Sequence, residues 1–171
     1  MRRHLRRTSL AAALLLALAT VVTLVASPVG AWSGWHHHHH HGDDHTINIP
    51  DTDKFVPFHM TIGEGDTVTW VNSDTDDHTV VSDDAFNDTG TTGLNQLIPG
   101  TDNNNGQPGT FTLEFHHEGT FVYYCRFHSK LDSDNQPVAP GPDGGIQDSN
   151  GNFGTPMSGV ITVVDNSRHD H

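Results

Sequence analysis

One cysteine and two histidines stand in a pattern that could bind a transition metal. Cys125 is the only cysteine of the chain; it directly follows the apolar stretch Thr120–Tyr124 and precedes His128 by three residues. On strand parity its sulfur shares a face with Phe121 and Tyr123 and points toward the core. A lone cysteine excludes an internal disulfide, and the nearby histidine favours a metal ligand over a reactive thiol. A hydrolase nucleophile would normally sit at a helix N-terminus with a remote histidine.

Two further side chains complete a plausible ligand set. His78 opens a new apolar stretch after a polar turn, and Met157 stands just before the last apolar stretch. One thiolate, two imidazoles and a distant thioether are the ligands of a trigonal copper site with a long, weak axial bond. Zinc would normally use more cysteines or a third strong ligand, and an iron–sulfur cluster would need more thiolates. The sequence therefore predicts one type 1 copper ion, shuttling between Cu(I) and Cu(II).

The elements that must position these residues are short β-strands. Apolar and polar residues alternate with period two in stretches that turn residues separate, which favours an antiparallel, all-β sandwich. The clearest stretches are Val56–Ile62, Thr67–Trp70, Phe111–Phe115, Thr120–Tyr124 and Gly159–Val164. Residues 83–109 and 129–156 are rich in Asp, Asn, Gly, Thr or Pro and do not fit as strands, although 94–98 is a short apolar island. We expect both to be long loops.

The order of the motifs resembles a known family. The strings W-V-N-S-D and H-T-V around His78, Y-Y-C-R-F-H at 123–128 and M-S-G-V-I-T-V from Met157 are similar to those of cupredoxins of the plastocyanin, pseudoazurin, halocyanin and amicyanin group. The resemblance implies a Greek-key sandwich with copper at one end, His78, Cys125 and His128 as equatorial ligands, and Met157 as the axial ligand. It also implies that the ring edge of His128 is the electron port and that the backbone N–H of Thr79 hydrogen-bonds the sulfur.

The chain departs from this family in one place. Members usually carry the methionine only a few residues after the second histidine, whereas 28 residues separate His128 from Met157 here. We interpret 129–156 as an insertion in the ligand loop, because the closing pattern after Met157 is kept. The alternatives are Gln136 or Gln147 as axial ligand, or no axial side chain.

The N-terminus predicts export to the periplasm, the cell surface or the medium. Four arginines, an apolar run over 10–26 and small residues at 30–31 are typical of a signal peptide spanning 1–31, with a retained membrane anchor as the alternative. Residues 32–44, with six consecutive histidines at 36–41, form a flexible segment that is either a native metal-gathering tail or a tag. The cupredoxin domain is then 45–166, and 167–171 is a tail.

Charge and site chemistry narrow the function. The formal net charge is −13, and removing 1–31, which holds four arginines and no acid, would lower it by four to −17. Such a chain will not bind nucleic acid by bulk charge, and any membrane contact would be transient or through an uncleaved anchor. The acidic surface is either simply solvated or steers the chain to a basic redox partner. We expect a monomeric one-electron carrier and not an enzyme. The alternative is a copper storage, scavenging or delivery protein without electron transfer.

Overall fold

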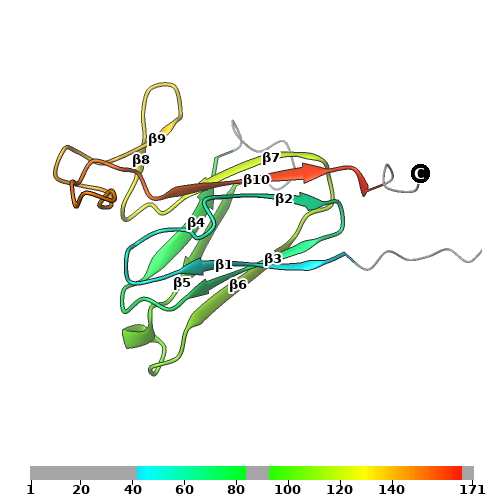
Figure 1. Ribbon diagram of the computed structural model, residues 1–171, viewed down its shortest axis with the longest axis horizontal. Coiled ribbons are helices and arrows are strands. Elements are labelled where there is room, and N and C mark those ends of the chain that lie inside the picture. Colours follow the sequence, from blue (N-terminus) through cyan, green and yellow to red (C-terminus); the bar gives the residue numbers. More distant parts are fainter. Residues whose placement is uncertain (1–41, 84–92, 167–171) are drawn as a thin grey trace, which may run out of the picture. The chain divides into compact units, whose positions relative to one another are not determined.

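The structure is a computed structural model that describes residues 42–83 and 93–166, and these form a sandwich of two β-sheets (Figure 1). The smaller sheet has the order β1-β3-β6 and the larger one the order β2-β10-β7-β4-β5. The strands are β1 (Asp44–Ile49), β2 (His59–Gly63), β3 (Thr67–Asn72), β4 (His78–Ser82), β5 (Leu94–Ile98), β6 (Gly109–Glu114), β7 (Gly119–Tyr124) and β10 (Ser158–Val164). The predicted signal peptide, the histidine run 36–41 and the tail 167–171 lie outside the described residues.

The strand order shows how the chain crosses between the two sheets. β1 pairs with β3 and β2 pairs with β10 in parallel, while β3–β6, β4–β5, β4–β7 and β7–β10 are antiparallel. Neighbours within each sheet are mostly not consecutive along the chain, as a Greek key requires. The predicted all-β, Greek-key sandwich is therefore confirmed. Within 42–83 and 93–166, no helix is long and apolar enough to cross a bilayer.

Aromatic side chains from both sheets fill the core. Trp70 on β3 stacks on Phe111 and meets the ring of Tyr123 on β7 edge to face, at centroid distances of 5.5 and 5.4 Å. Burial alternates along β7, where Phe121 and Tyr123 are fully buried, as the sequence pattern predicts. Gly159 on β10 lies opposite Tyr123, and a Cβ there would come within 2.3 Å of the tyrosine hydroxyl. Tyr123, two residues before Cys125, is thus closely packed.

One predicted loop contains a strand. The island Leu94–Ile98 is β5, which pairs antiparallel with β4 and places Ile98 opposite His78. Only Ile98 of this strand is buried, and the three residues between its ends are exposed. As an edge strand with little apolar surface to bury, β5 lacks the alternation by which strands are found in a sequence. The expectation that 83–109 contains no strand was therefore wrong.

The stretch Val56–Ile62 is a strand only in its second half. β2 begins at His59, and Val56 and Phe58 are 47% and 58% exposed. Val56 instead forms an isolated bridge with Asn48, which closes the loop between β1 and β2. The period-two pattern there is correct for Met60 and Ile62, which face the core side, and misleading for the two residues before them.

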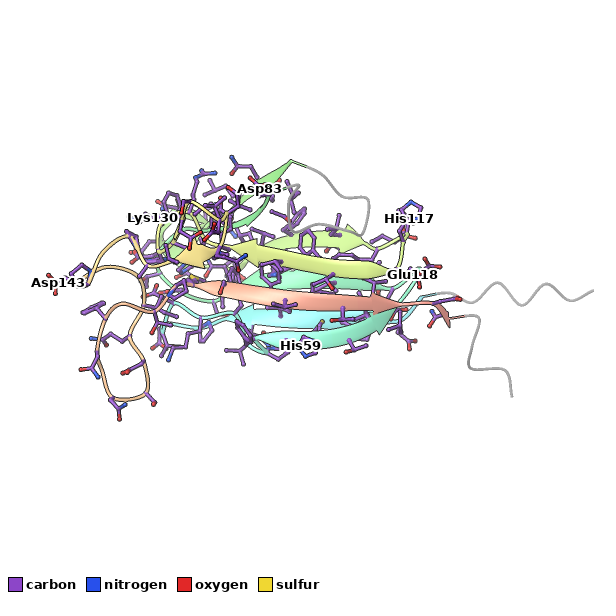
Figure 2. The ribbon with its side chains drawn as sticks, turned by 90° about the horizontal axis from the view of Figure 1, so that it is seen from above. His59, Asp83, His117, Glu118, Lys130 and Asp143 are labelled. Carbon is purple, nitrogen blue, oxygen red and sulfur yellow. The ribbon has the colours of Figure 1, made fainter. Side chains whose placement is uncertain are left out.

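The 129–156 segment is a loop with some local order. It contains a two-stranded ribbon of β8 (Lys130–Leu131) and β9 (Pro137–Val138), and a bridge between Ile146 and Thr155, so the expectation that it contains no strand was wrong as well, although each strand has only two residues. Its polar side chains stabilise turns within the segment. The Asp132 and Asp148 carboxylates each accept hydrogen bonds from two backbone N–H groups within the next four residues. In Figure 2, Lys130 and Asp143 of this segment lie at the end of the sandwich opposite His117 and Glu118. The segment therefore extends the end at which β7 finishes.

Candidate metal centre

The structure brings His78, Cys125 and His128 together at this end of the sandwich. His78 is the first residue of β4, Cys125 directly follows β7, and His128 lies in the turn after it. One ligand atom from each residue lies within 4.8 Å of the other two. His78 and Cys125 are fully buried, and the His128 side chain is 23% exposed. One donor atom from the start of β4 and two from the segment that directly follows the adjacent β7 thus lie close together.

A buried asparagine shapes the turn that delivers His78. The Asn72 amide at the end of β3 donates to the backbone oxygens of Asp76 and Ile98, at 2.8 and 3.1 Å, and its oxygen accepts the N–H of Asp74 at 3.1 Å. These bonds tie the 73–77 turn to both β3 and β5. The start of β4, and with it His78, is fixed by local hydrogen bonding.

The His78 ring is oriented by partners at both of its nitrogens. Nδ1 lies 3.7 Å from Cys125 Sγ, and Nε2 lies 3.1 Å from Oδ2 of the buried Asp74. A carboxylate that accepts from Nε2–H leaves Nδ1 free of a proton and able to bind a metal. Asp74 was not among the residues predicted for the site. The signal was present in W-V-N-S-D, which places an acid four residues before His78.

The inner nitrogen of His128 has no hydrogen-bond partner. Nδ1 is buried and makes no hydrogen bond to any described residue. A buried polar atom without a partner is costly in a folded protein, on the order of 1–3 kcal/mol. A metal ion beside Cys125 would satisfy it. The donor set of one thiolate and two imidazoles therefore fits copper both in kind and in placement.

Hydrogen-bond donors surround the Cys125 sulfur. The Thr79 hydroxyl lies 3.7 Å from Sγ and itself accepts the backbone N–H of Arg126 at 3.0 Å. Burial by itself raises the pKa of Cys125, but contacts with His128 and His78 and the backbone N–H groups of Phe127 and Thr79 outweigh it and lower the pKa to about 5. The Thr79 N–H contact is the one that the resemblance implied. The metal-free site therefore holds a thiolate near neutral pH.

Met157 lies beside this cluster despite its distance in sequence. Its backbone oxygen accepts the Cys125 N–H at 2.9 Å and the Ser129 hydroxyl at 3.1 Å, and its side chain is fully buried. The two alternative axial ligands, Gln136 and Gln147, are exposed residues of the 129–156 segment. Of the three candidates, only Met157 is buried with the cysteine.

Comparison with known proteins places this geometry in a family. Residues 45–132 match the sequence model of the family described as copper binding proteins, plastocyanin/azurin family. The chain belongs to this family. It is therefore a copper-binding cupredoxin, and proteins of this family typically transfer electrons. The match ends inside the 129–156 segment and includes His78, Cys125 and His128 but not Met157.

Several solved cupredoxins resemble the chain. A structure titled as a novel purple cupredoxin from Nitrosopumilus maritimus is 23% identical, with a TM-score of 0.43, and the match covers 71% of this chain and all of that one. A proline-to-phenylalanine mutant of amicyanin in its reduced state is 21% identical, with a TM-score of 0.44 and coverage of 70% and 80%. A methionine-to-glutamine mutant of amicyanin with Cu(I) is 19% identical, with a TM-score of 0.45 and coverage of 71% and 82%. No curated protein matches the chain significantly.

Proposed function

We propose that this cupredoxin is an exported one-electron carrier whose single type 1 copper is held by His78, Cys125, His128 and, axially, Met157. The observation that carries the proposal is the convergence of one ligand atom each from His78, Cys125 and His128 to within 4.8 Å, where the buried Nδ1 of His128 has no hydrogen-bond partner among the described residues. When bound there, copper would accept and release one electron, with soft sulfur favouring Cu(I) and imidazole tolerating Cu(II).

The protein contributes a rigid frame for that exchange. Cys125 and Met157 are joined through the backbone, and His78 is fixed by Asn72 and Asp74. Ligands that keep their places in both copper oxidation states need little reorganisation when an electron arrives. This property supports a carrier more than a storage protein, which gains nothing from a fast exchange.

His128 offers the route for electrons to a partner. It is the most exposed of the four proposed ligands, and the neighbouring Phe127 is 49% exposed. Asp76 and Asp77 line a shallow cleft together with both residues. An apolar contact with carboxylates at its edge suits a redox partner with a basic surface.

The test is addition of Cu(II) to metal-free protein in which His36–His41 are replaced by serine, so that the histidine run cannot hold the metal. We expect an intense visible thiolate-to-copper band at one copper per chain, lost in Cys125→Ser. A colourless product, or a band that survives this substitution, contradicts the type 1 site. Fast electron self-exchange supports the carrier, whereas copper transfer to an acceptor without redox cycling supports the storage and delivery alternative.

A further inference from the structure

A second carboxylate reaches both candidate histidines from a different loop. Asp53 Oδ1 lies 3.5 Å from Nε2 of His78 and 3.8 Å from Nε2 of His128. These are the outer nitrogens, since Nδ1 of His78 faces the sulfur and Nδ1 of His128 is buried. One aspartate thus stands at the outer edge of both rings, whose centroids are only 5.2 Å apart.

The loop that carries Asp53 is anchored at its base. Asn48 and Val56 exchange two backbone hydrogen bonds of 2.8 Å, which close the excursion between β1 and β2. Phe55 is buried and packs edge to face on Tyr123, at 4.8 Å between centroids. Asp53 itself has a φ of +54°, and its N–H donates to the Pro50 oxygen at 3.2 Å. The backbone that carries the Asp53 carboxylate is therefore held in place by the fold.

The two acids at this end have different relations to the rings. Asp74 is buried and comes from the turn that delivers His78, and of the two rings it lies within hydrogen-bonding distance only of His78. Asp53 is 35% exposed in its side chain and lies beyond ordinary hydrogen-bonding distance from either ring, so it acts on them mainly through its charge. Its carboxylate also lies 3.8 Å from the ring of His128, which is proposed as the electron port.

We propose that Asp53 is a positioning residue of the copper site, whose carboxylate restrains both imidazoles from their outer edges and favours the more highly charged Cu(II) over Cu(I). This inference rests on the proposed copper ligands. A negative charge at the outer edge of both rings attracts the positive charge of a metal ion that the two rings bind. At an effective dielectric constant of about 40 and a separation of roughly 6–7 Å, Coulomb attraction to one such partly exposed charge changes the Cu(II)-to-Cu(I) affinity ratio by about tenfold.

The variants follow from the backbone at Asp53. Asparagine and glycine adopt a φ of +54° readily, so Asp53→Asn and Asp53→Gly remove the charge without straining the turn. Asp51→Asn is the matched control, because Asp51 belongs to the same loop and is exposed, and no ion pair joins it to either histidine among the described residues. All are made in the protein with serine at His36–His41. Unfolding of each metal-free variant by urea shows whether the fold is kept.

The measurement is the affinity for Cu(II) and for Cu(I), each determined by competition with a chelator at one fixed pH. We expect the Cu(II)-to-Cu(I) affinity ratio to fall by about tenfold in both Asp53 variants and to change by less than about twofold in Asp51→Asn, whose charge is screened by solvent. An unchanged affinity ratio in the Asp53 variants, or an equal change in the Asp51→Asn control, overturns the role of Asp53. If these proteins still show the thiolate-to-copper band, the proposed function is unaffected.

Two other results are also decisive. Absence of the band in the parent protein overturns the copper ligands and the role of Asp53 together. Ligand atoms of Asp53, Asp74 and His78 also lie within 4.8 Å of one another. The alternative role for Asp53 is therefore that of a ligand to a second metal ion, bound in addition to the copper at Cys125. If the parent protein binds two copper ions per chain and Asp53→Asn binds one, Asp53 is a metal ligand and not a positioning residue.

Discussion

Replacing Thr79 with valine tests the network around the Cys125 sulfur. The hydroxyl of this fully buried residue accepts the Arg126 N–H at 3.0 Å and lies 3.7 Å from the sulfur. Valine has nearly the same shape and suits a strand equally well, so the substitution removes the hydroxyl and little else. Thr79→Ser is the control, since it keeps the hydroxyl and loses only a methyl group.

The expected magnitude follows from these contacts. Loss of one hydrogen bond whose N–H partner remains partly buried costs about 1–2 kcal/mol in the free energy of unfolding. With a urea m-value of about 2 kcal/mol/M, the midpoint for metal-free protein falls by roughly 0.5–1 M. Thr79→Ser loses about 0.8 kcal/mol for its methyl group. The order of stability is therefore wild type, serine, valine.

A second measurement separates the two variants more sharply. The Thr79 N–H contributes to a Cys125 pKa of about 5, against an ordinary value of 9.0, and the Thr79 hydroxyl lies 3.7 Å from the same sulfur. Loss of the hydroxyl favours the neutral thiol, so the midpoint of the ultraviolet thiolate absorbance should rise in Thr79→Val and stay unchanged in Thr79→Ser. A Thr79→Val protein that is at least as stable as Thr79→Ser and keeps the wild-type thiolate midpoint would refute the role of the hydroxyl.

Three further predictions concern the other parts of the site. His128→Ala removes a group that holds the Cys125 pKa down to about 5, so the thiolate midpoint of metal-free protein should move to higher pH; a midpoint still near 5 would show that His128 does not act on the sulfur. Met157→Leu conserves volume and should cost less than about 1.5 kcal/mol of unfolding free energy, whereas Met157→Ala should cost about 2–5 kcal/mol in the same urea titration. Replacing residues 130–155 with a short glycine-serine linker should preserve the thiolate-to-copper band, because Ser129 already bonds the Met157 oxygen; an unfolded product would contradict this.

The sequence predicted the centre of the site because its residues obey periodic rules. Parity along an apolar strand put Cys125 on the core side with Phe121 and Tyr123, and the structure buries all three. The spacing from Cys125 to His128 placed the imidazole in the following turn, close enough to share a metal. His78 was found as the residue that opens an apolar strand, and it is the first residue of β4.

The surroundings of the site follow no such rules. Asp53 lies in a loop, and nothing in its neighbours shows that a bridge from Asn48 to Val56 turns it toward the histidines. Phe58 has the right residue type and parity for the core but is 58% exposed, because β2 begins only after it. Contacts of this kind depend on pairing between strands that are far apart in the sequence. Such pairing can be predicted from one sequence only where both strands bury a face with regular alternation.

The unusual distance between His128 and Met157 is resolved by the same long-range pairing. β10 runs antiparallel to β7 with Ser158 opposite Tyr124, so the residue before Ser158 must come level with Cys125. The hydrogen bond from the Cys125 N–H to the Met157 oxygen is the continuation of this ladder. The position of Met157 is thus set by strand register and not by the length of the loop that precedes it. A loop of any length that leaves β10 paired with β7 places Met157 beside Cys125. This explains how the cupredoxin can carry a long loop between His128 and Met157 without displacing a proposed ligand.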